Sequence, residues 1–388
     1  MTNDFVLLNQ PLSPLAPRVG QLTTTHGKIL TPAFNPVATQ ATVKAISSAE
    51  LEDLGVSTII ANSYHLLMRP GIDLIEELGG IHSFMSWMHP IATDSGGFQI
   101  FSLGHMLQVD DDRLTFKSHI DGSLHSLTPE EAIQNQERLG VDLMMSLDQC
   151  VPFTNEIEAV QMGVRRTTLW ARRCREAWSG KAMLFGIIQG GVFPEEREKS
   201  AKELVAMDFP GYAIGGLSVG EPKQSMYATL DSSCELLPIN KPRHLLGVGS
   251  PEDLLEAIAR GVDLFDSALP TRIARNGSLF TPEGRINILN ARFKNQSGPI
   301  YPGCDCVTCT NYSTSYLHHL FKTQELLSLR LASIHNLRFI LRLLEEVRVA
   351  IRANEFNAYK EAFLQTYKPT DEQTRIAQKA KWASARRG

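Results

Sequence analysis

The chain has 388 residues, of which 43% are hydrophobic and 21% charged, and its formal net charge at neutral pH is −4. This composition is typical of a globular protein and excludes collagen-like, disulfide-scaffold and wholly disordered chains. The near-neutral charge also argues against a polycation that coats nucleic acid, so any RNA contact has to come from a local basic patch.

No apolar run approaches the roughly 18 to 20 residues that a membrane span needs. The first twenty residues also lack the basic start and sustained apolar stretch of a secretory signal. We therefore expect a cytoplasmic protein without a membrane partner. In that compartment the six cysteines are not expected to form a disulfide framework.

Short apolar or β-branched runs recur along the chain, and each ends in Gly, Asp or Asn before a helix-like stretch. Because these runs are near-continuously apolar, both faces of their sheet are expected to be buried, as in a parallel sheet. They predict eight strands, at about 29–37, 57–62, 90–94, 142–148, 183–189, 211–216, 243–248 and 262–266.

The connections between these runs read as helices. Thr128 and Ser250 are each followed by a proline and two acids, a pattern typical of helix starts. Helix-period stretches also occupy about 47–54, 155–178, 194–206 and 222–236. Eight β/α alternations favour an α/β fold of the (β/α)8 TIM-barrel type, with a doubly wound open sheet as the alternative. Residues 103–125 interrupt this alternation of strands and helices, and they predict an inserted hairpin.

From about residue 286 the pattern changes to a cysteine cluster and then to a long amphipathic helix near 323–353. We expect residues 1–285 to form an irregular catalytic barrel with an N-terminal extension. Residues 286–368 are then a C-terminal zinc-binding subdomain whose helices pack on the barrel, and residues 369–388 a flexible basic tail.

Three cysteines within six residues, Cys304, Cys306 and Cys309, indicate a metal site rather than redox chemistry. Thiolates with one imidazole in a tetrahedral set favour zinc. His318, His319 and His335 are candidates for the fourth ligand, and His335 is preferred because it lies well inside the following helix. Four protein ligands would leave no position for substrate, so the zinc is expected to be structural.

Polar residues follow the predicted strands, and in a barrel such residues converge on one mouth. Three aspartates, a glutamine and several glycines there suit a flat polar ligand, whose face Phe98 could stack on. The strand ends in question carry Asp94 to Gln99, Asp148 to Cys150, Gln189 to Gly191, Gly215 to Gly220, Gly247 to Gly249, and Asp266 with Ser267.

Two carboxylates flanking one ligand are the catalytic groups of enzymes that cleave a glycosidic bond with retention of configuration. They are typical of a sugar hydrolase as well as of a base-exchanging enzyme. Asp263 and Asp266 compete for one of these roles, and their odd spacing lets only one face the mouth, so Asp266, nearer the strand end, is preferred. Asp94 alone is equally explained as a turn cap. Arg272 and Arg275 follow just after Asp266. Such arginines often form ion pairs in a solvated loop, but their closeness to the acid favours a role in clamping phosphates that flank a nucleotide.

Taken together, DSGGFQ at 94–99, LDQC at 147–150, QGGV at 189–192, GGLSVGE at 215–221 and FDSALPTRIARNG at 265–277 resemble the tRNA-guanine transglycosylases. The three-cysteine cluster with His335 resembles that family's zinc signature, and the resemblance runs in order over about 15–368. It implies a homodimer that exchanges the wobble guanine of GUN-anticodon tRNAs (those for aspartate, asparagine, histidine and tyrosine) for 7-aminomethyl-7-deazaguanine (preQ1) in queuosine biosynthesis.

The resemblance also implies roles for single residues. Asp266 is the expected nucleophile on ribose C1′, and Asp94 the general acid/base. The expected base-binding residues are Asp94, Ser95, Gly96, Gly97, Phe98, Asp148, Gln189, Gly216 and Leu217. The expected RNA-binding residues are Gly247, Val248, Gly249, Ser250, Pro251, Glu252 and Asp253 with Thr271, Arg272, Ile273, Ala274 and Arg275. One structural Zn²⁺ per subunit is implied on Cys304, Cys306, Cys309 and His335.

The chain departs from the family's common pattern at several positions. Phe98 stands where many members have Tyr, Gln149 where Glu is usual, and Ser267 where Cys is frequent. His244 and Leu246 replace a common Tyr and Met. Val219 and Cys150 favour preQ1 over the larger base queuine. Queuine use, a non-catalytic tRNA-binding paralogue and a retaining glycosidase remain the alternatives.

Overall fold

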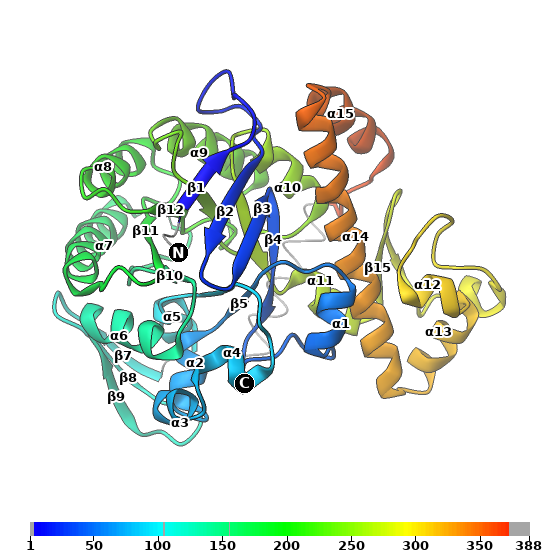
Figure 1. Ribbon diagram of the computed structural model, residues 1–388, viewed down its shortest axis with the longest axis horizontal. Coiled ribbons are helices and arrows are strands. Elements are labelled where there is room, and N and C mark those ends of the chain that lie inside the picture. The colour runs from blue at the N-terminus through cyan, green and yellow to red at the C-terminus, as the bar shows by residue number, and fades with distance from the viewer. Residues whose placement is uncertain (1–3, 104, 155, 372–388) are drawn as a thin grey trace.

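In a computed structural model of the chain, which describes residues 4–103, 105–154 and 156–371, eight parallel strands close into a barrel (Figure 1). This confirms the predicted (β/α)8 architecture and excludes the open sheet. Around the barrel the strands are β4 (Ala33–Ala38), β5 (Ile59–Ala61), β6 (Ile91–Thr93), β10 (Leu143–Met145), β11 (Met183–Ile188), β12 (Gly211–Ile214), β13 (Arg243–Leu245) and β14 (Leu264–Ser267), which pairs with β4.

All the outer helices but the last follow their predicted positions closely, and the last, over 269–275, is not indicated by the sequence patterns. They are α1 (Ser48–Asp53), α6 (Pro129–Leu139), α7 (Ile157–Ala177), α8 (Pro194–Val205), α9 (Lys223–Glu235), α10 (Pro251–Ile258) and α11 (Leu269–Arg275). Thr128 caps α6 in a reciprocal capping box with Glu131, and Gly140 ends the helix in the left-handed conformation. Ser250, by contrast, makes no side-chain cap on α10, because its hydroxyl donates to Asp253 at 2.5 Å instead.

Short helices that the sequence patterns did not indicate fill two connections. Between β5 and β6 the chain forms α2 (Ser63–Met68), α3 (Ile72–Glu77) and α4 (Gly80–Met85), and α5 (Gly97–Leu103) follows β6. Each has only six or seven residues, too few for a helical period to show in the sequence. None of the helices in the described ranges is long and apolar enough to cross a membrane.

The first predicted strand, 29–37, is wrong as a single element. Its first part belongs to an antiparallel sheet of β1 (Asp4–Leu7), β2 (Gly20–Thr24) and β3 (Gly27–Thr31), and only β4 enters the barrel. Pro32, which has no N–H to donate, separates β3 from β4. An apolar run does not reveal such a change of sheet.

This N-terminal sheet closes the end of the barrel where the strands begin. Phe5, Leu22 and Ile29 pack into the same buried cluster as the first residues of several barrel strands, among them Ala33 and Leu264. The opposite end, where the strands finish, is therefore the one left for a ligand.

The predicted insertion after β6 is present, but the predicted hairpin is wrong in extent. It is a three-stranded antiparallel sheet of β7 (His105–Val109), β8 (Leu114–Lys117) and β9 (Leu124–Leu127). The third strand was missed because its four residues include His125 and Ser126, and three of its four side chains are at least partly exposed. It pairs along its length with β8.

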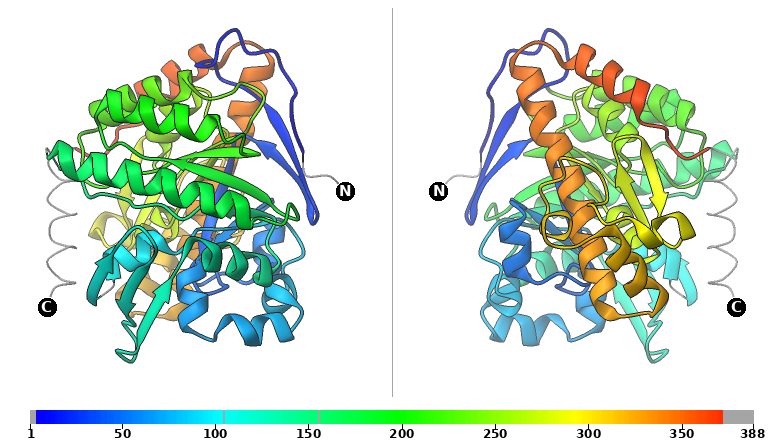
Figure 2. Two further views of the ribbon diagram at one scale, coloured as in Figure 1. Left: turned by 90° about the vertical axis from the view of Figure 1, so that its left-hand side faces the viewer. Right: turned by 90° about the vertical axis from the view of Figure 1, so that its right-hand side faces the viewer.

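After α11 the chain leaves the barrel and returns to it. It forms β15 (Ser278–Thr281), β16 (Gly284–Asn287), the 3-10 helix η1 (Ala291–Asn295), α12 (Val307–Asn311), α13 (Thr314–Lys322), α14 (Leu326–Arg352) and α15 (Phe356–Thr366). The long helix α14 packs against α11 and β4, with α12 and α13 beside it (Figure 2). Most of the predicted tail, 372–388, lies outside the described residues.

Candidate active site and metal cluster

The acidic and amide residues expected at the barrel mouth do follow the ends of neighbouring strands. Asp94 comes directly after β6, Asp148 lies three residues beyond β10, and Gln189 comes directly after β11. Asp266 is the third residue of the four in β14. Because the strands are parallel, these four side chains lie toward one end of the barrel.

Hydrogen bonds from the neighbouring strand end hold Asp94 in place. Its Oδ2 accepts from Asn62 Nδ2 at 2.5 Å, and its Oδ1 accepts from the backbone N–H groups of Ser63 and Gly96, both at 3.1 Å. Asn62 also caps α2 by accepting from the N–H of His65. The amide that holds the carboxyl is thus itself fixed by a helix start.

The surroundings of Asp94 raise the pKa of its carboxyl group. Loss of hydration, with the negative charge of Asp266, raises its pKa to about 7, although hydrogen bonds from the Ser63 and Gly96 N–H groups oppose the rise. Asp94 and Asp266 lie toward the same end of the barrel, and the negative charge of one raises the pKa of the other. A carboxyl group with a pKa near neutrality is suited to give and take a proton at physiological pH.

Asp148 and Gln189 form one polar edge. Gln189 Nε2 donates to Asp148 Oδ2 at 2.6 Å, and both side chains are buried. Burial raises the pKa of Asp148 to about 6, although the bonds from Gln189 and Ser95 oppose the rise. Loss of hydration raises the pKa of the neighbouring Cys150 thiol to about 12, so this thiol is not a nucleophile.

The glycines after β12 make room for Gln189. Gly216 has a φ of 67°, and a Cβ there would lie 2.3 Å from Gln189 Oε1. Only glycine fits this position. Further along the loop, the carboxylate of Glu221 is bound by the backbone N–H groups of Ser218, Val219 and Gly220, the latter two at 3.0 and 3.1 Å. Leu217 is buried within this loop.

Asp266 is held by the neighbouring strand. His244 Nε2 lies 2.9 Å from Asp266 Oδ1, and the N–H of Gly247 donates to the same oxygen at 3.3 Å. Asp263, its competitor in the sequence, lies at the opposite end and is fully buried in an ion pair with Arg18. Asp263 is thus committed to joining the N-terminal sheet to the barrel.

Phe98, the residue expected to stack on the base, and the first candidate RNA-binding segment, 247–253, differ in accessibility. Phe98 is 48% exposed at the start of α5, which leaves its ring free to stack. Gly247 is exposed, but Pro251 and Glu252 are buried. The segment ends in an ion-paired group in which Lys223 Nζ lies 2.6 Å from Glu252 and 2.7 Å from Asp253.

The second candidate RNA-binding segment, 271–275, lies within α11. Arg272 is exposed and Arg275 is half-buried, whereas Thr271 and Ala274 are buried and Ile273 is partly exposed. The middle of the first segment is also mostly inaccessible: Val248 and Gly249 are buried, and Ser250 is partly exposed. Among the polar residues of the two segments, Arg272 is exposed, as is the backbone at Gly247, whereas Ser250, Asp253 and Arg275 are only partly exposed.

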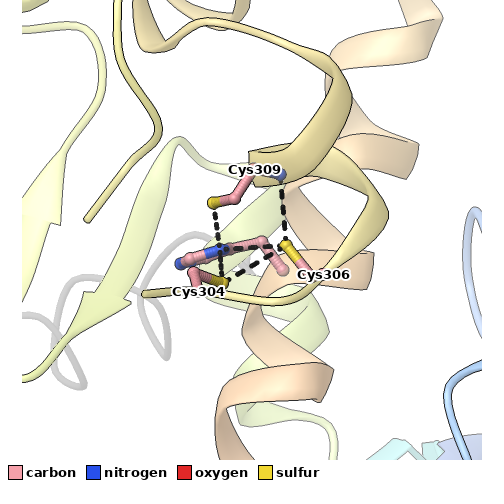
Figure 3. A group of neighbouring side chains, drawn as sticks. Cys304, Cys306 and Cys309 are labelled. Atoms are coloured by element: carbon pink, nitrogen blue, oxygen red, sulfur yellow. Dashed lines mark hydrogen bonds between the residues drawn. The ribbon is translucent and has the colours of Figure 1, made fainter. Parts of the chain in front are cut away.

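Four side chains converge beside α14. The ligand atoms of Cys304, Cys306, Cys309 and His335 lie within 4.8 Å of one another, so the cluster is able to hold a metal ion (Figure 3). His335 Nδ1 is 3.6, 3.5 and 3.4 Å from the three sulfurs in that order. Its Nε2 lies 2.8 Å from the Phe280 carbonyl, which turns Nδ1 toward the sulfurs. Of the rejected candidates, His318 bonds the Ile288 carbonyl at 2.7 Å.

The sequence patterns missed the partners of the two carboxyl groups. Asn62 comes directly after the second barrel strand, β5, so the rule that polar strand-end residues converge would have identified it. Glu221 is the last residue of the motif at 215–221. His244 was noticed only as a departure from a family pattern, because its distance from Asp266 is set by two strands that pair only in the fold.

The chain is similar to known proteins over nearly its whole length. The family model of queuine tRNA-ribosyltransferase matches residues 15–369. The queuine tRNA-ribosyltransferase of Dehalococcoides mccartyi strain BAV1 is 50% identical over 389 residues, covering all of this chain and 99% of that protein. The chain belongs to the queuine tRNA-ribosyltransferase family.

Two further members of the queuine tRNA-ribosyltransferase family show the same likeness. The protein of Desulforamulus reducens is 51% identical over 90% of this chain and 95% of its own length. That of Herpetosiphon aurantiacus is 51% identical over 94% of this chain and 93% of its own length. Members of this family are tRNA-guanine transglycosylases, which are pentosyltransferases, and the predicted family and enzyme class are confirmed.

Proposed function

We propose that this chain exchanges the wobble guanine of GUN-anticodon tRNAs for preQ1 in queuosine biosynthesis, through a covalent ribosyl intermediate on Asp266. The observation that carries this proposal is the pair of carboxyl groups at the barrel mouth. Asp266 accepts bonds on one oxygen, while the nearby Asp94 has a pKa of about 7. One group is thus arranged to attack and the other to move a proton.

In the first displacement the Asp266 carboxylate attacks C1′ of the ribose. The C1′–N9 bond breaks, and guanine leaves with the electron pair and takes a proton from Asp94. In the second, the incoming base gives its N9 proton to Asp94 and attacks C1′, which releases the Asp266 carboxylate. Two inversions retain the ribosyl configuration.

The other mouth residues would bind the base. The Asp148–Gln189 edge offers carboxylate and amide groups to a guanine-like edge, Ser95, Gly96 and Gly97 line the turn after β6, and Phe98 stacks on the exposed face. Gly216 and Leu217 would contribute backbone groups. The target base has to leave its stack to reach this mouth, which is easiest in a single-stranded anticodon loop.

Zinc is the ion that the cysteine cluster fits best. With Zn–S near 2.3 Å and Zn–N near 2.05 Å, a tetrahedral site places sulfur and nitrogen about 3.6 Å apart. The observed separations of 3.4 to 3.6 Å agree with this value. With four protein ligands the ion would be structural, fixing residues 286–368 against the barrel as a zinc-binding subdomain.

The proposal includes a homodimer, which the family resemblance implies, and a cytoplasmic location, which the sequence predicts. It also names preQ1 rather than queuine as the incoming base. The choice of base rests on Val219 and Cys150, which stand beside the base-binding residues in the chain. Offering both bases to tRNA and measuring incorporation of each decides it, and preferential use of queuine would overturn the choice.

The experiment that tests the activity is exchange of labelled guanine into unmodified tRNA. Wild-type protein is expected to incorporate the label. A tRNA-binding paralogue would bind tRNA without incorporation, and a sugar hydrolase would act without RNA. The proposal is overturned if the protein incorporates no label into tRNA, or if it hydrolyses a sugar substrate instead.

Asp266→Asn tests the nucleophile. Because an amide does not attack C1′, this variant is expected to lose exchange and to form no denaturation-resistant complex with tRNA on a gel. Asp231→Asn is the matched control, since it makes the same chemical change on the outer helix α9, where Asp231 is about half-exposed. Near-normal turnover by Asp266→Asn means that another group is the nucleophile.

A further inference from the structure

His244 is an interior residue of the barrel. It is the middle residue of β13 and fully buried, pairing in register with Ala213 on β12 and Leu264 on β14. Its ring meets Phe185 edge-on, with centroids 6.4 Å apart at 87°. Backbone pairing with β12 and β14 and the ring contact with Phe185 of β11 fix the position of the imidazole.

The hydrogen bonds of His244 indicate which nitrogen carries the proton. Nε2 lies 2.9 Å from the Asp266 carboxylate, which only accepts, so the ring donates through Nε2. Nδ1 is buried and meets no hydrogen-bond partner among the described residues. A second proton there would have no acceptor, so the arrangement favours the Nε2–H tautomer.

The two oxygens of Asp266 differ as a result. Oδ1 accepts from both His244 and the Gly247 N–H. Within the described part of the chain, both hydrogen bonds to this carboxylate end on Oδ1 and neither on Oδ2, while the group as a whole is partly buried at the mouth. One oxygen is therefore tethered and the other is left with its lone pairs available.

We propose that His244 is a positioning residue for the nucleophile: its Nε2–H tethers Asp266 Oδ1 and so presents Oδ2 as the oxygen that attacks C1′. This inference rests on the proposed function. The new bond joins Oδ2 to C1′, the C1′–N9 electron pair leaves with guanine, and guanine takes its proton from Asp94. Oδ1 becomes the ester carbonyl, and His244 keeps its proton throughout.

Two matched pairs of variants distinguish the effect of the hydrogen bond to Asp266 from the effect of side-chain packing at position 244. His244→Tyr and His244→Phe differ by one hydroxyl, and His244→Gln and His244→Met are similar in shape but only Gln has a donor. We expect the donor variants to keep kcat for guanine exchange within about tenfold of wild type. The variants without a donor should lose about 10²-fold in kcat, because the attacking oxygen is no longer aligned.

The same variants should leave KM for tRNA within about twofold, and the rate of covalent adduct formation in a single turnover should fall with kcat. Circular dichroism identifies variants that do not fold. If one member of a pair does not fold, the comparison is made with the other pair. Equal kcat within a folded pair, or a change confined to KM, overturns the inference. Silence of the wild-type enzyme would instead overturn the proposed function.

Discussion

Asp94 shows how a single side chain acquires the acidity that its proposed role requires. Its pKa of about 7 reflects loss of hydration together with the nearby charge of Asp266, only partly offset by bonds from Ser63 and Gly96. Because the group is an acid whose pKa is raised, it holds its proton up to about pH 7 and loses it above.

The pH dependence of guanine exchange follows from this shift. If Asp94 has to be protonated to expel guanine, kcat/KM is expected to be level below pH 7 and to fall about tenfold per unit well above it. Asp94→Asn should lower the rate by about 10² to 10⁴-fold and remove this pH dependence. The measurement is the exchange rate between about pH 5.5 and 9 for both proteins. A wild-type rate that stays level up to the top of this range contradicts the assignment.

At the scale of elements, the N-terminal sheet is joined to the barrel by a buried ion pair. Arg18 Nε donates to Asp263 Oδ1 at 2.9 Å, and its other nitrogens donate to the Ile239 and Lys241 carbonyls at 2.7 and 2.8 Å. Both side chains are inaccessible to water. The pair thus links the segment before β2 to the start of β14.

Removing the arginine leaves a buried carboxylate without its partner. Arg18→Met is expected to lower the free energy of unfolding by about 3 to 5 kcal/mol, measured by urea denaturation. The control is Arg138→Met, whose exposed pairs with Asp73 and Glu76 should contribute only about 0 to 1 kcal/mol. If both variants lose the same free energy of unfolding, the buried ion pair stabilises the fold no more than the exposed pairs do.

The metal cluster should stabilise the C-terminal elements rather than the reaction. Chelation, or Cys306→Ser, is expected to release about one zinc per chain and to increase hydrogen exchange between η1 and α13. Zinc content and hydrogen exchange are both measured. Cys174→Ser, a buried cysteine outside the cluster, should keep the metal. Unchanged protection after zinc removal would refute the structural role.

For the whole molecule, a net charge of −4 means that tRNA affinity cannot rest on bulk positive charge. The basic groups that follow Asp266 in the chain are Arg272, which is exposed, and Arg275, which is half-buried, both in the last turn of α11. Arg165, on the outer helix α7, forms an ion pair with Asp111 and does not belong to either candidate RNA-binding segment. A few phosphate contacts near the mouth should therefore account for most of the electrostatic affinity.

The salt dependence of tRNA binding measures this number. A plot of log K against log salt concentration is expected to have a slope of about −2 to −4, and Arg272→Gln should reduce its magnitude by about 1. Arg165→Gln, the matched control, should leave the slope unchanged. Binding isotherms at several salt concentrations provide the data, and a slope of about −10 would indicate an extended basic surface instead.

The sequence by itself determined the β/α alternation, which favours a barrel, and four polar residues at the ends of its strands. Apolar strand runs with regular helix starts, such as Thr128-Pro129, specify a parallel sheet, because local hydrogen bonding and burial both act over a few residues. Asp94, Asp148, Gln189 and Asp266 follow from the rule that strand ends converge. Three cysteines within six residues likewise specify a metal cluster before any folding is known.

Only the tertiary structure decided how these groups are held. Splitting 29–37 between two sheets, adding β9 to the insertion and enclosing Asp263 with Arg18 all depend on contacts between distant segments. The tether from His244 to Asp266 and that from Asn62 to Asp94 are of the same kind. Sequence patterns report which side chains are available, whereas the distances between them arise only when the strands pair and the barrel closes.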